Sequence, residues 1–190
     1  TMRNPASAPI LVRIAREELL KIIISPMDVN SDASVSENIR SIEETYGPID
    51  VLVNNAGIEG HGSIEETPLS DFRAVMETNY FGCIRCIQAV MPGMRKRRNG
   101  LIINISSVAG RIASPPLGPY NATKFALEAL SESLAAEAGM FNIRVAIIEP
   151  GIIETDMARS ITHTPPDQIY PHVKRFSGLF SAALEHHVSA

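Results

Sequence analysis

The 190-residue sequence contains no tryptophan, only two cysteines and no long run of apolar residues. Its longest apolar stretch, around 145–148, stops at Glu149, far short of the roughly 20 residues that span a bilayer. A formal charge of -4 and a pI near 5.7 give no general attraction to nucleic acid or anionic membranes. We therefore expect a soluble, cytoplasmic protein with no nucleic-acid or membrane partner. A chain of this length can bury a core without disulfides.

Metal and thiol chemistry are also poorly represented. Cys83 and Cys86 form a C-x-x-C pair, but they lie inside a predicted helix, whereas a redox pair gains its low pKa at a helix start. No second cysteine pair completes a zinc site, and the scattered histidines lack ligand spacing. We interpret both cysteines as buried small apolar residues and predict no metal.

Short apolar runs alternate with longer helical patterns from Ile22 onward, which is typical of a parallel α/β sheet. The apolar run at 51–53 has no polar alternation, which indicates a strand covered on both faces. We predict one domain, 1–190, with a doubly wound sheet in three α/β/α layers. The predicted strands cover 22–25, 51–53, 101–105 and 145–148. The predicted helices cover 32–46, 70–91, 119–138 and 170–184. We expect Ser31 or Asp32 to cap the first of these helices, Ser70 to cap the second, and Pro92 to kink the second helix or end it.

Tyr120 and Lys124 are four residues apart, so on a helix they share one face. A phenol with an ordinary pKa of about 10 exchanges protons slowly at neutral pH, and bringing that pKa to about 7 requires roughly 4 kcal/mol. One cation about 4 Å away supplies roughly that energy at an effective dielectric of 20. The pair therefore predicts a tyrosine that acts as an acid or base, although alone the motif is weak.

Further polar residues follow predicted strands or interrupt a predicted helix. Ser107 lies thirteen residues before Tyr120, just after a strand, and Asn79 occupies the middle of a helix, where asparagine is a poor helix former. The turn 54–57 follows another buried strand at its carboxyl end, where open α/β sheets bind ligands. These positions predict a ligand site at that edge of the sheet.

Six motifs occur here in the order and spacing of one family. They are Asp28-Val29, Asn54-Asn-Ala-Gly57, Asn79-x-x-Gly82, Asn104-Ile-Ser-Ser107, Tyr120-x-x-x-Lys124 and Pro150-Gly151-x-x-x-Thr155. Together they resemble the short-chain dehydrogenase/reductase family, over residues 1 to about 159. The segments 1–4 and 124–134 are similar to the branch that holds 17β-hydroxysteroid and retinol dehydrogenases.

The resemblance implies an NAD(P)-dependent oxidoreductase that interconverts a secondary alcohol and a ketone or aldehyde by hydride transfer. It assigns proton transfer to Tyr120 and substrate hydrogen bonding to Ser107, with Ser106 the less favoured serine. Lys124 lowers the pKa of Tyr120 and binds the nicotinamide ribose, and Asn79 anchors a water relay. The implied cofactor-binding residues are Arg3, Asp28, Val29, Asn54, Ala56, Gly57, Tyr120, Lys124, Pro150, Gly151, Ile153 and Thr155.

Arg3 bears on the choice of cofactor. The resemblance places it at the end of the family's second strand, where an acid binds the 2′-hydroxyl of NAD and a base binds the 2′-phosphate of NADP. Met2 occupies the usual place of the acid, so we favour NADP(H), with NAD(H) as the alternative. If Arg3 does not bind the cofactor, it is simply a solvated arginine.

The family's glycine-rich turn, T-G-x-x-x-G-x-G, occurs nowhere in the sequence. That turn places a pyrophosphate on a helix N-terminus. We expect the turn and its strand to precede Thr1, the family's last strand to follow Ala190, and the chain to be part of a longer protein.

The resemblance also assigns residues 152–184 to a substrate lid and two helices to subunit contacts. The apolar lid residues are Met157, Ile161, Ile169, Tyr170, Phe176, Leu179 and Phe180. They favour a hydrophobic substrate, but an amphipathic helix packed on the core explains them equally. Glu59 and His61 lie near the pocket mouth, and we expect them to be solvated loop residues. The two helices that the resemblance assigns to subunit contacts lie at 72–94 and 120–138. Small side chains that allow close helix packing are Ala122, Ala126, Ala129 and Ala136, so we expect a homodimer or homotetramer.

Two other functions fit the same fold. A non-catalytic dinucleotide sensor or scaffold binds cofactor without turnover, although such relatives lose the tyrosine or the lysine that this chain keeps. An epimerase or lyase uses the same pair but regenerates its cofactor, so the net cofactor consumption separates it from an oxidoreductase.

Overall fold

A computed structural model describes residues 1–7, 9–151, 153, 169 and 170 of the chain. Its elements follow in the order η1 (Pro5–Ser7), α1 (Pro9–Glu17), α2 (Asp32–Tyr46), β1 (Val51–Asn54), α3 (Leu69–Met76), η2 (Glu77–Phe81), α4 (Gly82–Arg97), β2 (Gly100–Ile105), η3 (Val108–Gly110), α5 (Gly118–Gly139) and β3 (Ile143–Ile148). Among these residues, no helix combines the length and apolar character needed to cross a membrane.

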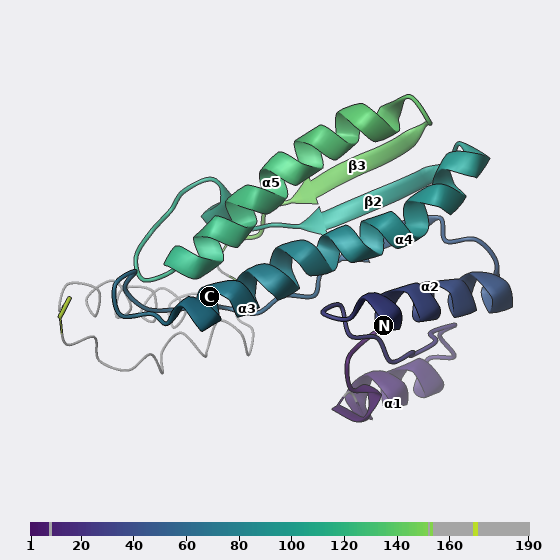
Figure 1. The fold of residues 1–190 in the computed structure, drawn as a ribbon. Helices are drawn as coiled ribbons and strands as arrows, with labels where there is room; N and C mark the ends of the chain where they lie inside the picture. The colour runs from purple at the N-terminus through teal and green to yellow at the C-terminus, as the bar shows by residue number, and fades with distance from the viewer. Residues whose placement is uncertain (8, 152, 154–168, 171–190) are drawn as a thin grey trace.

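The three strands form one parallel sheet in the order β1-β2-β3. Val51 lies opposite Leu101 and Asn54 opposite Asn104, so β1 and β2 end together. A parallel connection requires a crossover, and here long helices supply it. In Figure 1 the arrowheads of β2 and β3 point toward the end of the molecule at which α5 begins. The carboxyl ends of the strands therefore meet near the start of α5.

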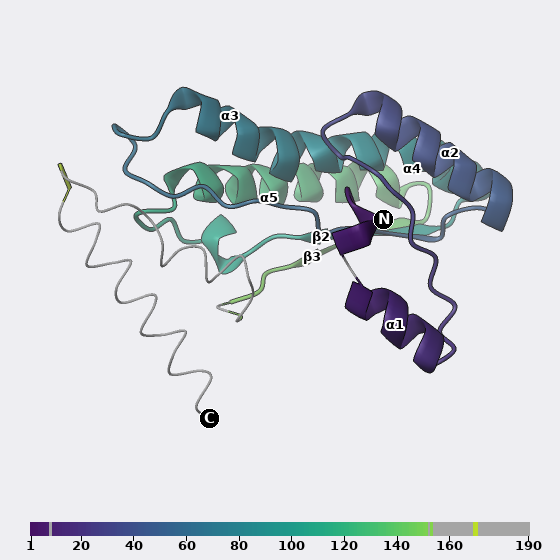
Figure 2. The same ribbon diagram turned by 90° about the horizontal axis from the view of Figure 1, so that it is seen from below.

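Helices lie on both sides of the sheet, which confirms the predicted α/β class. Figure 2 shows α2, α4 and α5 together on one side of the strands and α1 on the other. The buried core forms between the sheet and the first group, where Val90, Met94 and Ile102 are fully buried. Ser31 caps α2, as predicted, by accepting a hydrogen bond from the Ser34 N–H at 3.2 Å.

The prediction that 51–53 is covered on both faces is wrong for the described residues. Val51 and Val53 are 49% and 52% exposed, whereas Leu52 between them is buried. Successive side chains of a strand point to opposite faces, so the two valines occupy the face opposite α4. No element within the described residues packs over them there.

The helix predicted at 70–91 is longer and less regular than expected. It begins at Leu69 after Pro68, so Ser70 is not its cap, and it passes through the π-helical segment η2 into α4. Pro92 does not end the helix, which continues to Arg97. An interior proline costs about 3 kcal/mol. The complete burial of Val90 and Met94 on either side of Pro92 offsets that cost.

The amino-terminal prediction was wrong in two respects. Residues 22–25 form no strand, and the nearby backbone makes one isolated bridge between Met2 and Pro26. A strand needs a continuous hydrogen-bonded partner, but this contact consists of two bonds, from Met2 N to Ser25 O and from Met27 N to Met2 O. The sequence reasoning also missed α1. The predicted helix 170–184 and most of the predicted lid, 152–184, lie outside the described residues.

Candidate active site

The residues singled out from the sequence gather beyond the carboxyl ends of the three strands. Asn55 follows β1, Ser106 and Ser107 follow β2, and Glu149 follows β3. The N–H of Ser106 donates to Ile148 O at 2.8 Å, and the N–H of Val108 donates to Pro150 O at 3.1 Å. These bonds continue the β2–β3 pairing past the strands, and they hold two of the loops in one place.

Tyr120 and Lys124 project from the first turns of α5 toward the same side. Lys124 Nζ lies 5.4 Å from the centroid of the Tyr120 ring. The ammonium donates a hydrogen bond to Ile105 O at 2.7 Å, and the Lys124 residue is only 7% exposed. The last carbonyl of β2 therefore fixes the lysine beside the phenol.

The proton affinities of this pair differ from the sequence-based expectation. The pKa of Tyr120 lies above its ordinary value, chiefly because the phenol is buried. The hydrogen bond with Ser107 lowers this pKa, and the negative charge of Glu59 raises it, but both effects are smaller than that of burial. Burial also lowers the pKa of Lys124. The expected effect of the Lys124 charge on the Tyr120 pKa is therefore opposed by burial in this structure. Desolvation disfavours the charged form of both groups.

Ser107, rather than Ser106, faces Tyr120. Its hydroxyl hydrogen-bonds the phenol and accepts the N–H of Ala109 at 3.1 Å, which caps the short helix η3. Ser106 is 3% exposed, and its hydroxyl has no hydrogen-bond partner within the described chain. A Cβ on Gly110 would lie 2.8 Å from the Ser106 oxygen. Ser106 therefore lies beneath η3, away from the phenol.

Asn79 lies in the π-helical segment and is 1% exposed. Its Oδ1 accepts the N–H of Ile58 at 2.8 Å, and its Nδ2 donates to Ile58 O at 2.8 Å and to Thr123 Oγ1 at 3.1 Å. Thr123 in turn donates to Tyr120 O. Asn79 thus connects the loop after β1 with the first turn of α5. π-segments are frequent at functional sites, and the poor helix former at 79 was the only signal for this one.

At the amino-terminal end of the site, Arg3 lies beside Asp28. Arg3 Nε is 3.5 Å from Asp28 Oδ1, and their side chains are 63% and 40% exposed. Val29, the next residue, packs against α4, where a Cβ on Gly82 would lie 2.9 Å from Val29 Cγ2. The glycine of the Asn79-x-x-Gly82 motif therefore serves close packing. The structure places Arg3, Asp28 and Val29 together.

Asn54 is turned into the protein instead. It is 6% exposed, and its Nδ2 donates to Asn104 Oδ1 at 2.9 Å. Asn104 donates to Ser131 Oγ at 2.8 Å, and Ser131 donates to Leu127 O at 2.6 Å. The side chain of Asn54 is committed to this network, so its backbone alone remains for a ligand. The sequence analysis gave Asn104 no role. The signal was available, because β1 and β2 each carry an asparagine at the position where they pair.

The remaining predicted cofactor residues lie on exposed backbone. Ala56 is exposed and Gly57 half-buried after β1, while Pro150 is half-buried and Gly151 exposed after β3. Ile153 is 57% exposed. Thr155 lies outside the described residues. Both loops are thus open to a ligand that runs along the edge of the sheet.

Glu59 and His61 are not the solvated loop residues that the sequence suggested. His61 Nε2 lies 2.6 Å from Glu59 Oε2, and the two side chains are only 13% and 12% exposed. Gly60 between them has no space for a side chain, because a Cβ would lie 2.8 Å from Val75 Cγ2 and 2.9 Å from Pro119 Cβ. The three-residue spacing Glu-Gly-His was the available signal, since the glycine lets the loop pack closely.

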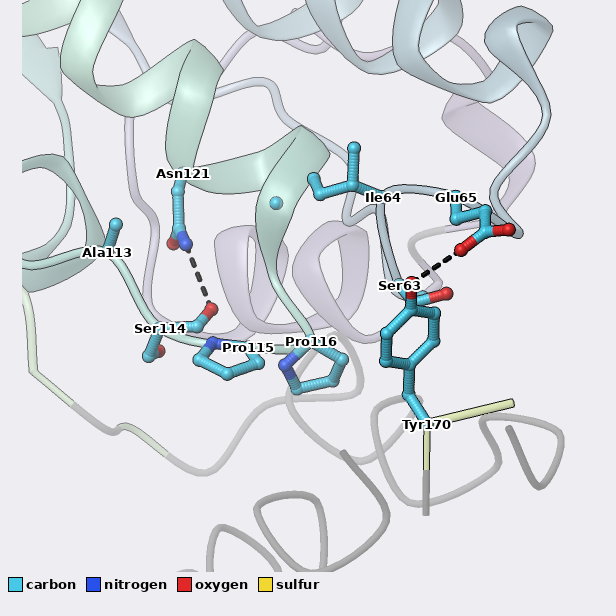
Figure 3. Close-up of a pocket in the computed structure, with 11 residues that line it drawn as sticks. Ser63, Ile64, Glu65, Ala113, Ser114, Pro115, Pro116, Asn121 and Tyr170 are labelled. Carbon is cyan, nitrogen blue, oxygen red and sulfur yellow. Dashed lines mark hydrogen bonds between the residues drawn. The ribbon is translucent and has the colours of Figure 1, made fainter. Parts of the chain in front are cut away.

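A cavity of about 640 Å³ opens beside the start of α5. Its lining is mainly apolar and comes from 62–65, from 113–116, from Gly118 and Asn121, which flank Tyr120, and from Tyr170. In Figure 3 the Asn121 amide donates to Ser114 O, at 3.0 Å, and the Tyr170 ring stands on the opposite side of the opening with its hydroxyl on Glu65. The cavity is of the size of a small-molecule pocket.

Cys83 and Cys86 are free and buried, as predicted. Burial raises the pKa of Cys83 to about 11 and also raises that of Cys86, which disfavours the reactive thiolate. Within the described ranges, no three His, Cys, Asp or Glu side chains come together as a metal site.

The protein is thus an α/β protein with a parallel sheet. At the carboxyl edge of that sheet, where such sheets bind ligands, a tyrosine, a lysine, a serine and a buried asparagine form an acid–base site. Residues 3–166 match the family model described as short chain dehydrogenase, and the chain belongs to this family.

Relatives and solved structures agree with this assignment. The chain is 41% identical over 157 residues to retinol dehydrogenase 8 of Homo sapiens, covering 82% of this chain and 50% of that protein. A gluconate 5-dehydrogenase from Burkholderia cenocepacia, in complex with NADP and tartrate, is 34% identical with a TM-score of 0.79, covering 85% of this chain and 64% of that one. An NAD⁺-bound xylitol dehydrogenase is 29% identical with the same TM-score, covering 85% and 64%. The chain thus spans about half to two thirds of their length.

Proposed function

We propose that the protein is an NADP(H)-dependent oxidoreductase that interconverts a secondary alcohol and a ketone or aldehyde of hydrophobic character. The observation that carries the proposal is the Tyr120 phenol, which has the Ser107 hydroxyl on one side and the Lys124 ammonium 5.4 Å from its ring. This arrangement offers a substrate oxygen both a proton and a hydrogen bond at one point.

In the direction of reduction, the Tyr120 hydroxyl gives its proton to the substrate oxygen while the carbonyl carbon accepts a hydride. A bound nicotinamide supplies that hydride. Ser107 donates a hydrogen bond to the same oxygen and stabilises the charge that develops there. In oxidation, the phenolate of Tyr120 takes the hydroxyl proton. Lys124 favours the phenolate by its positive charge, and Ile105 O keeps the ammonium in place.

Asn79 has a supporting role in this proposal. Its amide is occupied by Ile58 and Thr123, so it holds the first turn of α5 against the loop after β1. We propose that Asn79 thereby keeps Tyr120 and Lys124 in register with the cofactor loops. The water relay implied by the family resemblance remains part of the proposal.

The described residues fit the two ends of a dinucleotide. Exposed or half-buried backbone at 56–57 and 150–151, beyond the ends of β1 and β3, suits the nicotinamide ribose, and Asp28 with Val29 suits an adenine. The guanidinium of Arg3 pairs with Asp28 but stays 63% exposed, so it can also bind a 2′-phosphate. This guanidinium supports NADP over NAD, whereas the solved relatives include examples with each cofactor.

The apolar cavity supports a hydrophobic substrate. It opens next to Gly118 and Asn121, so a substrate whose carbonyl meets Tyr120 places its apolar body against Ile64, Pro115 and Pro116. The similarity to a retinol dehydrogenase agrees with this chemistry. We further propose a homodimer or homotetramer, because Ala122, Phe125 and Ala129 leave an exposed apolar strip on α5. The cytoplasmic location expected from the sequence stays part of the proposal.

The decisive experiment replaces Tyr120 by Phe in the full-length protein and follows NADPH oxidation with ketones and retinal. Turnover falls by roughly 10²-fold or more, because the proton donor is lost, while NADPH affinity stays near that of the wild type. Tyr46→Phe, at an exposed position, serves as the control. Turnover retained by Tyr120→Phe contradicts the proposal. NADPH binding without turnover in the wild type favours a sensor, and product formed without net cofactor change favours an epimerase or lyase.

Cofactor choice is tested by Arg3→Asp. The ratio of kcat/KM with NADP to kcat/KM with NAD falls by roughly tenfold or more, because a carboxylate repels the 2′-phosphate that the guanidinium binds. Arg40→Asp, an exposed change on α2, leaves the ratio unchanged. An unaltered ratio in Arg3→Asp overturns the assignment of NADP.

A further inference from the structure

The turn that carries Ser107 is joined to the loop after β3 by a main-chain contact and by a side-chain contact. The N–H of Val108 donates to Pro150 O at 3.1 Å. Arg111, the residue after η3, reaches the residue before Pro150, since its Nε donates to Glu149 Oε1 at 3.0 Å. Its Nη2 lies 2.9 Å from the same oxygen. The two segments are therefore held together twice.

The same guanidinium also reaches α5. Arg111 Nη2 lies 3.2 Å from Glu128 Oε2, and Glu128 is only 4% exposed. Neither carboxylate oxygen of Glu128 accepts a hydrogen bond from the described residues, so the ion pair with Arg111 compensates a buried charge. Gly110, just before Arg111, packs on α5, because a Cβ there would lie 3.1 Å from Glu128 Cγ. Burial and charge thus fix the arginine against the helix that carries Tyr120.

The carboxylates around Arg111 do different things. Glu132 lies 3.8 Å from Nη1, is 67% exposed and belongs to the same helix as Glu128. An exposed pair of this kind contributes little. Glu149 receives two nitrogens on one oxygen and belongs to the segment that continues into Pro150. Among these three carboxylates, Glu149 is the one that connects α5 and η3 to the loop after β3.

We propose that Arg111 is a positioning residue that, through Glu149, sets the place of the loop 150–151 relative to Ser107, and with it the affinity for the nicotinamide half of the cofactor. The inference rests on the proposed function, in which the backbone at 150–151 binds the nicotinamide ribose. Glu128 holds the guanidinium on the side of α5, and the guanidinium holds the loop. In this proposal Arg111 touches neither substrate nor cofactor and acts only through its partners.

The test measures the affinity of the full-length protein for two ligands by isothermal titration calorimetry. NADPH has both halves of the cofactor, whereas adenosine 2′,5′-bisphosphate has only the adenine half. In Glu149→Gln the Kd for NADPH rises by roughly threefold to tenfold, while the Kd for the bisphosphate stays within about twofold of the wild type. Glu132→Gln removes a carboxylate from the same arginine without touching the loop, and it leaves both Kd values unchanged. A general loss of structure would weaken both ligands alike.

A second comparison tests whether Glu149 acts through Arg111. In a Glu128→Gln background, where no buried carboxylate is left unpaired, Arg111→Met weakens NADPH binding to the same degree as Glu149→Gln. The combination of the two is no weaker than either alone, because both remove one link. Unchanged NADPH affinity in Glu149→Gln, equal weakening of both ligands, an equal effect of Glu132→Gln, or additive effects of the two changes overturns the inference.

Binding needs no turnover, so the two proposals fail separately. The expected loss of NADPH affinity in a protein that reduces no carbonyl supports the inference and contradicts the proposed function. A wild-type protein that reduces ketones, with variants that bind NADPH normally, supports the proposed function and overturns the inference. A wild-type protein that binds no nicotinamide dinucleotide overturns both.

Discussion

The side chain of Asn79 pairs with the backbone of Ile58 as a neighbouring strand would, accepting its N–H and donating to its C=O, both at 2.8 Å. One amide thus satisfies both main-chain groups of a loop residue. The same Nδ2 also reaches Thr123, so a single buried side chain connects η2, the loop after β1 and α5.

Asn79→Ala is expected to weaken the fold by about 1–3 kcal/mol, because it removes these bonds and leaves Ile58 without partners. Chemical denaturation measures the free energy of unfolding. Asn99→Ala, at an exposed position, is the control and changes that free energy by less than about 0.5 kcal/mol. A result for Asn79→Ala as small as that of the control refutes the connecting role.

Gly82→Ala is expected to destabilise by about 1–3 kcal/mol, since its new methyl group would lie 2.9 Å from Val29 Cγ2. Val29→Ala in the same protein recovers part of the loss by making space. Gly139→Ala, near the end of α5, meets nothing within 4 Å and is expected to stabilise by about 0.4–1 kcal/mol. Thermal unfolding of the four proteins checks both signs. Equal effects at positions 82 and 139 contradict the packing argument.

Cys83 predicts a loss of stability at alkaline pH. Burial raises the pKa of this thiol from 9.0 to about 11, so the folded state keeps the proton longer than the unfolded state does. The contribution of the thiol is fully present below pH 9 and is lost as the pH rises through about 11, a change of about 2–3 kcal/mol. In Cys83→Ala the fall in unfolding free energy between these pH values is smaller by this amount. Parallel pH curves for the two proteins exclude the assignment.

The elements best predicted from sequence were those with their own local signals. The strand β2, the helix α5 and the Ser31 cap follow from an apolar run, a helical period and a capping residue. The strand expected at 22–25 was wrong because an apolar run reveals nothing about a partner, and the backbone there makes a single bridge. The sequence left open whether Pro92 kinks or ends its helix; the helix continues to Arg97, because tertiary burial outweighs a local cost.

The positions of the site residues were predictable, whereas their energetics were not. The spacing of Tyr120 and Lys124 placed them on one face of a helix, as the structure has them. The burial that raises the Tyr120 pKa, and the burial of Glu59 with His61, depend on loops brought in from other parts of the chain. Desolvation is a property of the packed molecule, so no single segment of sequence encodes it.

The buried amides of Asn54 and Asn104 have a consequence for how the strands find one another. A slip by one residue moves every side chain of a strand to the other face of the sheet, so a strand with one buried face has a preferred alignment. A shift of β1 by one residue would bring Val53 or Asn55 opposite Asn104. The buried Asn104 amide would then lose its hydrogen-bond partner, which costs about 1–3 kcal/mol of stability. The hydrogen bonds from Asn54 through Asn104 to Ser131 therefore favour the observed alignment of β1 and β2 over one shifted by a residue.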